Sequence, residues 1–154
     1  MKIMAVDYGD TRTGLAVCDR TEFLASPVGV IGERNFYFTI QKVAHAVKEY
    51  DVQMVVVGYP VNMNGTVGPR AEKCAQFAEL LKTKVDVPVE LWDERATTLE
   101  AQNYLSETGT YGKKRKEVID EVAATIILES YMTYRHNMQK MAERKTTEAE
   151  TAEK

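Results

Sequence analysis

The spacing of apolar residues along the chain predicts five strands. Short apolar runs at residues 2–7 and 14–19 flank a turn rich in Gly, Asp and Thr, a pattern typical of a β-hairpin. Residues 22–32 predict an irregular third strand. The continuous apolar run at residues 54–60 is typical of a buried parallel strand, and residues 87–94 predict the last strand.

Helical periodicity fills the intervals between these strands. Asn35 is suited to cap a helix that runs to about residue 50, and Pro69 is suited to the first turn of a helix that ends near residue 84. Further helices are predicted at residues 97–107 and 117–138, separated by a Gly-rich, then basic loop at residues 108–116. The order predicts an α/β fold, with a mixed five-stranded sheet flanked by helices.

The chain of 154 residues, 44% of them apolar, is suited to one domain with an ordinary core. We expect this domain to span residues 1–138 and residues 139–154 to form a charged, disordered tail, because the tail lacks an apolar stripe. No apolar run approaches the roughly 20 residues that cross a membrane. Cys18 and Cys74 form no CxxC pair, so we expect reduced core cysteines and a cytoplasmic protein.

Charge and histidine content exclude several function classes. A net charge of −3 argues against a protein that coats nucleic acid by charge alone, but allows an acidic metal centre with a local basic rim. The two histidines, His45 and His136, lie in an ordinary helical pattern and near the tail, which argues against a His-based metal site or a Ser-His-Asp triad. Neither a GxGxxG nor a Walker A sequence is present.

Acidic residues stand where an α/β sheet binds its ligands, beyond the carboxyl ends of strands. Asp7 closes the first predicted strand, Asp93 and Glu94 close the last, and Asp120 lies near the start of the final helix. Taken singly, each strand-end acid is equally suited to a turn or a helix cap, and a lone acid such as Asp120 is more commonly a helix-dipole partner or a surface residue. Together, converging carboxylates would repel one another without cations, and they favour Mg²⁺ or Mn²⁺. Two such ions activate a water and stabilise the leaving oxygen in phosphoryl transfer.

Polar and basic residues surround the same strand ends and predict contacts with phosphate. They are Arg12, Asn62, Asn64, Arg70, Lys73, Arg95, Lys113, Lys114, Arg115 and Lys116. Such contacts give affinity and register rather than base specificity. For the basic run at residues 113–116, a solvated loop without a binding role is an equal alternative.

Four ordered blocks resemble the YqgF-type family of Holliday-junction-resolvase-like proteins, described as nucleases that mature the small-subunit ribosomal RNA precursor. The blocks are DYGDTRTGLAVCD (7–19), VVGYPVNMNGTVGPRAEKCAQFA (56–78), WDERATTLEA (92–101) and KKRKEVIDEVAATIIL (113–128).

The resemblance implies a ribonuclease-H-like fold and a metal-dependent nuclease. The family's catalytic acids, which would also bind the metal, fall on Asp7, on the Asp93–Glu94 pair and on Asp120. Of the pair we favour Glu94, which lies farther past the strand. The family's first loop usually carries Lys-Arg where this chain has Thr11-Arg12, so one positive charge that would favour substrate binding is missing.

The leading hypothesis is a metal-dependent endonuclease that acts on the 5′ end of precursor 16S ribosomal RNA. Its partners would be nucleic acid, RNA rather than branched DNA, and a pre-ribosomal particle, with the protein as a monomer or dimer. One alternative is a Holliday junction resolvase, and another is a non-catalytic nucleic-acid- or ribosome-associated binding protein. A sugar-kinase-like or actin-like phosphate binder would need two such domains, and 154 residues hold one.

Overall fold

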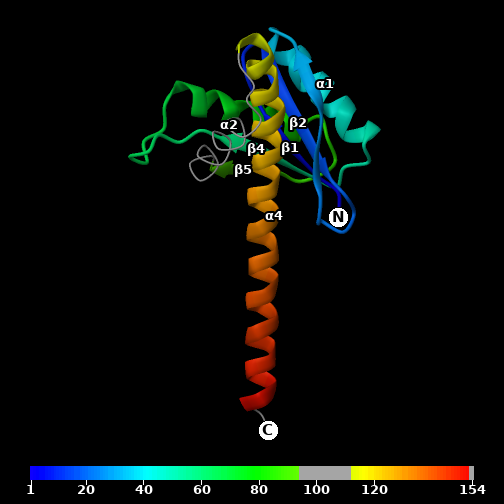
Figure 1. Ribbon diagram of the computed structural model, residues 1–154, viewed down its shortest axis with the longest axis vertical. Coiled ribbons are helices and arrows are strands. Elements are labelled where there is room, and N and C mark those ends of the chain that lie inside the picture. The colour runs from blue at the N-terminus through cyan, green and yellow to red at the C-terminus, as the bar shows by residue number, and fades with distance from the viewer. Residues whose placement is uncertain (94–111, 153–154) are drawn as a thin grey trace.

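The computed structural model describes the backbone of residues 1–93 and 112–152 and the side chains of residues 1–93 and 122–147. In this part of the chain, five strands form one sheet in the order β3-β2-β1-β4-β5, with helices on both faces (Figure 1). The mixed five-stranded sheet expected from the sequence is confirmed. The helix predicted at residues 97–107 lies outside the described residues.

The first half of the sheet is antiparallel. β1 (Ile3–Asp7) pairs with β2 (Arg12–Cys18), and β2 pairs in turn with β3 (Ala25–Gly32). The pairing of β2 with β3 shifts register between Leu15 and Ala16, which accounts for the irregular pattern of the third strand. The predicted hairpin and third strand are therefore confirmed.

The second half is parallel and brings three strand ends together. β4 (Met54–Tyr59) runs parallel to β1, and β5 (Val89–Asp93) runs parallel to β4. Val55, Val56 and Val57 are fully buried, as a central parallel strand requires. The carboxyl ends of β1, β4 and β5 consequently meet at one edge of the sheet, and we call it the carboxyl edge.

Two helices cover one face of the sheet. α1 (Phe36–Glu49) begins where the Asn35 side chain accepts a hydrogen bond of 3.0 Å from the Phe38 N–H, and α2 (Pro69–Lys82) has Pro69 in its first turn, as predicted. Their apolar sides bury Val43 and Phe77 against Met4 and Val6 of the sheet.

α4 (Gly112–Ala152) covers the opposite face. Its Ala124, Ile127 and Leu128 pack in one cluster with Ile3 and Ala5 of the sheet. Tyr131 is also buried, while Tyr134, next along the same side of the helix, is 46% exposed although its ring contacts Trp92 of β5 at 5.2 Å.

Both ends of α4 differ from the sequence prediction. The helix begins at Gly112, so the basic run at residues 113–116 is helical, and the predicted loop there is wrong. Lys, Arg and Glu are strong helix formers, and no Gly or Pro interrupts the sequence after Gly112.

The helix also continues to Ala152 instead of ending near residue 138. Residues 139–152 are rich in Ala, Glu, Lys and Arg, so the packed part of the helix supplies a nucleus from which they propagate it. Residues 139–147 are exposed, and this part of α4 projects away from the sheet (Figure 1). The boundary between a domain of residues 1–138 and a separate tail stays a prediction. No helix within the described residues combines the length and the apolar character needed to cross a membrane.

Candidate functional site

Asp7 ends β1 at the carboxyl edge and lies on the face that α4 covers. Side chains alternate along a strand, and the residues two and four positions before Asp7 pack under α4. The residue level with Asp7 on each neighbouring strand is a glycine. Gly14 is its partner on β2, and Gly58 follows the pairing of Val6 with Val57 on β4. No side chain from either position crowds the Asp7 carboxylate.

Asp93 ends β5 at the same edge but on the other face. It is level with Tyr59, and Tyr59 packs into the core beneath α1 and α2. Asp7 and Asp93 therefore lie on opposite faces of the sheet. Glu94 and Arg95, which follow directly, lie outside the described residues.

Asp120 belongs to the part of α4 whose backbone alone is described, together with Lys113, Lys114, Arg115 and Lys116. Position 120 is one turn before the fully buried Ala124, so it lies on the side of α4 that faces the sheet. No group of three or more His, Cys, Asp and Glu side chains gathers within the described residues. The expected acid cluster includes two residues whose side chains are outside that set, so the cluster stays a prediction.

Arg12 begins β2 beside Asp7. It alternates with Thr13, so it shares the α4 face with Gly14 and Asp7. Its Nη1 atom is buried, and within the described residues it has no hydrogen-bond partner. A buried guanidinium nitrogen without a partner is costly, and an anionic oxygen would remove the cost.

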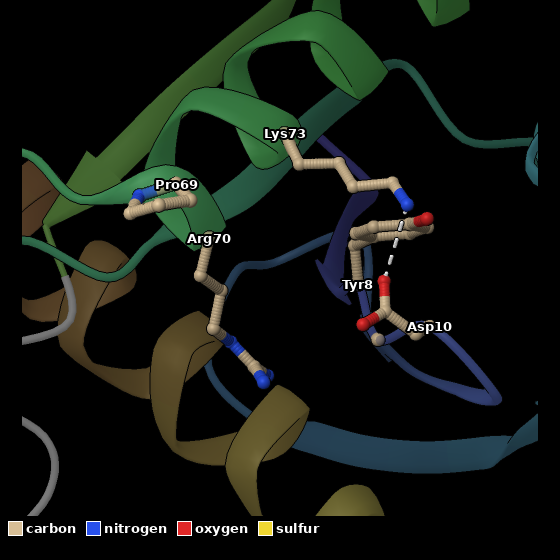
Figure 2. Close-up of a pocket in the computed structure, with 6 residues that line it drawn as sticks. Tyr8, Asp10, Pro69, Arg70 and Lys73 are labelled. Carbon is tan, nitrogen blue, oxygen red and sulfur yellow. Dashed lines mark ion pairs between the residues drawn. The ribbon is translucent and has the colours of Figure 1, made fainter.

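A cavity of about 230 Å³ opens between the β1–β2 turn and the start of α2 (Figure 2). Tyr8 and Asp10 line it from the turn, and Arg70 and Lys73 line it from the helix. We call it the basic pocket. The sequence predicted Arg70 and Lys73 as site residues but not Tyr8 and Asp10, although Tyr8 and Asp10 lie in the same loop motif as Asp7.

Lys73 is held in place across the basic pocket. Its Nζ lies 3.3 Å from Asp10 Oδ1, as the dashed line in Figure 2 marks. The hydrogen bond to Asp10, with the nearby Tyr8 oxygen and the Asp10 charge, raises the pKa of Lys73, so its ammonium group stays charged. Burial raises the pKa of Tyr8, and this effect outweighs the opposing charge of Lys73, so the phenol stays neutral.

The start of α2 adds a positive backbone dipole to the basic pocket. Gly68 is the N-cap residue, and no side chain caps the helix there. A Cβ at Gly68 would meet only Asn62 Nδ2, at 3.8 Å, so the approach to the helix is open. Helix N-termini of this kind favour anions, phosphate among them.

Asn62 and Asn64 have structural partners in the loop before α2. Asn62 Nδ2 donates to Thr66 Oγ1 at 2.9 Å, and Asn64 Oδ1 accepts from the Thr66 hydroxyl at 2.6 Å. These bonds shape the loop that leads to Gly68. A role for either residue in nucleic-acid binding stays a prediction.

Comparison with known proteins gives close sequence relatives. The family model described as "RuvX: Holliday junction resolvase" matches residues 1–134. A Halothermothrix orenii protein named "Putative pre-16S rRNA nuclease" is 41% identical over 138 residues, which are 90% of this chain and 99% of the relative. A Listeria monocytogenes protein of the same name is 46% identical over 134 residues, covering 86% of this chain and 97% of the relative.

Solved structures with low sequence identity share the fold. Thermus thermophilus RuvC, solved in complex with a Holliday junction substrate, aligns with a TM-score of 0.56 at 13% identity, covering 86% of this chain and 96% of that chain. The fowlpox virus Holliday junction resolvase aligns with a TM-score of 0.52 at 16% identity, covering 87% and 99%. The ribonuclease-H-like fold implied by the sequence resemblance is thus confirmed. With a family model matching residues 1–134 and relatives over 40% identical along nearly their whole length, the chain belongs to the RuvX family.

Proposed function

We propose that this protein is a divalent-metal-dependent endonuclease that hydrolyses a phosphodiester near the 5′ end of precursor 16S ribosomal RNA. The observation that carries the chemistry is Asp7 at the carboxyl edge, with glycines level with it on both neighbouring strands and Arg12 on the same face, whose buried Nη1 has no hydrogen-bond partner within the described residues. The names of relatives 41–46% identical to this chain supply the substrate.

Asp7, Glu94 and Asp120 would hold Mg²⁺ or Mn²⁺, because carboxylate oxygens are the ligands that these hard cations prefer. The position of Asp93 on the opposite face from Asp7 supports Glu94 as the ligand from the last strand. Bound there, the metal would lower the pKa of the attacking water and stabilise charge on the leaving oxygen.

The course of α4 supports Asp120 as the third ligand. The Tyr131 hydroxyl contacts Met54 Sδ at 3.6 Å, at the beginning of β4, and Arg135 in the next turn pairs with Glu22 between β2 and β3, so the helix runs toward the edge of the sheet opposite the carboxyl edge. About 16 Å of helix separates positions 131 and 120 at 1.5 Å per residue. The strand from Met54 to Gly58 spans about 13 Å at about 3.3 Å per residue. The two lengths are similar, which is consistent with position 120 near the carboxyl edge.

The chain's basic groups would bind and orient the substrate backbone. Arg12 lies on the same face as Asp7 and would donate to a phosphate oxygen next to the reacting bond. Arg70 and Lys73 would hold a neighbouring phosphate in the basic pocket, helped by the uncapped start of α2. Such contacts fix the position of the nucleic-acid strand relative to the carboxylates. Positioning of this kind is a large part of phosphoryl-transfer catalysis.

A cleavage assay with a fragment spanning the 5′ end of precursor 16S ribosomal RNA tests the proposal. Asp7→Asn keeps the side-chain volume but removes a ligand charge. We expect cleavage in Mg²⁺ to fall by about 100-fold or more, since residues that merely support metal ligands already contribute 10–100-fold. Asp51→Asn is the matched control, because Asp51 is exposed, precedes β4 at the opposite edge of the sheet, and has a φ of 57° that Asn also tolerates.

Equal rates for Asp7→Asn and the unchanged protein would refute the mechanism. RNA binding without cleavage by the unchanged protein would favour the non-catalytic alternative. Work on a ribosomal RNA precursor would place the protein in the cytoplasm with a pre-ribosomal particle as partner, and the reduced state of the buried Cys18 and Cys74 is consistent with that compartment.

A second substrate is favoured by the family description and by the fold. Both the family model and the RuvC and fowlpox virus structures name Holliday junctions. The same protein should therefore be tested on a four-way DNA junction under the same conditions. Faster symmetric cleavage of the junction than of the RNA fragment would replace the ribosomal RNA assignment.

A further inference from the structure

A second cavity, of about 460 Å³, lies between α1 and α2 on the outer side of the basic pocket. This volume is in the range of pockets that hold small ligands, about 300–1,000 Å³. We call it the α1–α2 groove. Its lining residues are Phe36, Tyr37, Lys73, Ala75, Gln76, Glu79 and Leu80. Lys73 also lines the basic pocket, so the two cavities lie on either side of one side chain.

A row of aromatic rings leads from the carboxyl edge to this groove. Tyr8, the residue after Asp7, stacks on Phe77 at 4.8 Å and meets Phe36 edge-on at 5.7 Å. Phe36 in turn meets Tyr37 edge-on at 5.5 Å. Tyr8 and Phe77 are buried, whereas Tyr37 is 65% exposed. The row therefore ends in the Tyr37 ring, which contacts Phe36 on one side and is exposed to solvent on the other.

The charges around the groove favour an anion beside that ring. The Lys73 ammonium lies 5.8 Å from the centre of the Phe36 ring. The first turn of α1 contains no acidic residue and the exposed Arg34 precedes it, while the neighbouring acid, Glu33, is paired with Lys42 at 3.3 Å. The one acid in the lining, Glu79, is paired with Lys82 at 2.8 Å. A group with an aromatic face and a negative charge is the ligand that this surface complements.

We propose that the α1–α2 groove binds an unpaired nucleotide of the substrate, with its base stacked on Tyr37 and its phosphate at Lys73. This inference rests on the proposed nuclease function, and it adds that the substrate is single-stranded where it passes over α1 and α2. Base faces inside a duplex are covered by their neighbours, so proteins stack aromatic rings mainly on unpaired bases. A protein segment is less suited to the groove, because it would bury the charges of Lys73 and Glu79.

The test measures RNA binding in the Asp7→Asn background, so that its result does not depend on cleavage. One probe is an RNA hairpin with an unpaired 5′ extension, and the other is the same hairpin with the extension fully paired. Tyr37→Ala should weaken binding of the first probe by about 10-fold or more, the effect expected for loss of one stacked base. Tyr37→Trp should retain the affinity, and binding of the paired probe should not change.

Phe23→Ala is the matched control. Phe23 is a more exposed ring, 84% exposed, in the turn between β2 and β3 at the opposite edge of the sheet, and its removal should leave both affinities unchanged. Unchanged affinity of Tyr37→Ala for the unpaired probe would overturn the proposal, as would an equal loss on the paired probe. A failure of the proposed function would instead show as a lack of Mg²⁺-dependent cleavage by the unchanged protein.

Discussion

Replacing Gly9 with Ala should distort the turn that carries the candidate site. Gly9 lies between β1 and β2, and a Cβ built on it would be 2.3 Å from the Arg12 carbonyl oxygen. Comfortable non-bonded contacts between heavy atoms are about 3.5 Å or longer. The opposing atom belongs to the backbone, so no side chain can turn aside to make room. The turn must open by roughly 1 Å instead.

The expected loss in unfolding free energy is about 1–2 kcal/mol. Forcing an extra carbon into a packed site costs about 1–3 kcal/mol. Against this, Gly→Ala stabilises by about 0.4–1 kcal/mol through the lower entropy of the unfolded chain. The turn has little freedom to adapt, because the fully buried Thr13 hydroxyl contacts both the Gly9 N–H and its carbonyl, at 3.4 and 3.5 Å. Since Asp10 and Arg12 move with the turn, RNA affinity should fall as well.

Urea unfolding followed by the fluorescence of Trp92 measures this loss. Trp92 is the single tryptophan and packs edge-on against Tyr131 at 5.3 Å, so its emission reports on the core. Gly32→Ala is the control, because Gly32 pairs with Arg12 from β3 and a Cβ there would meet no atom within 4 Å. That variant should be as stable as the unchanged protein or up to about 1 kcal/mol more stable. Equal midpoints for Gly9→Ala and Gly32→Ala would refute the steric reasoning.

Two further predictions concern Glu22, at the edge of the sheet opposite the carboxyl edge, and the end of α4. Burial alone would raise the pKa of Glu22, but hydrogen bonds and charges from Arg135 and the N-terminal amino group, at 2.6 and 3.1 Å, hold that pKa below its usual range. This carboxylate therefore stabilises the fold above the unfolded-state pKa of about 4.3, and the stabilisation is lost as pH falls through the lower folded-state pKa. Glu22→Gln should lower the unfolding free energy by about 1–3 kcal/mol at pH 7 and make it depend less steeply on pH in the acid range. The same pH dependence in the variant and the unchanged protein would contradict this prediction. Truncation after Met138 should change the unfolding free energy by less than about 0.5 kcal/mol, because side chains 139–147 are exposed; a loss of several kcal/mol would make the tail part of the domain.

Local sequence patterns determined most of the elements of this fold. The alternation and length of the apolar runs located all five strands, and Asn35 and Pro69 marked the starts of two helices, because caps and first turns depend on neighbouring residues alone. The sequence also placed Asp7 at a strand end, where α/β sheets bind ligands. The extent of α4 was misjudged, because neither the basic run nor the charged tail has an apolar stripe, yet both consist of strong helix formers.

The relation between the candidate site residues was decided only by the tertiary structure. The pairing register of β1, β4 and β5 places Asp7 and Asp93 on opposite faces of the sheet, and a shift of one residue would reverse that relation. The contact between Lys73 and Asp10 joins a helix to a turn more than 60 residues away in sequence. No local pattern encodes such a contact, because it depends on how α2 packs across the sheet. The sequence therefore supplied the chemical groups of the carboxyl edge, and the packing of the sheet and helices determined which of them meet.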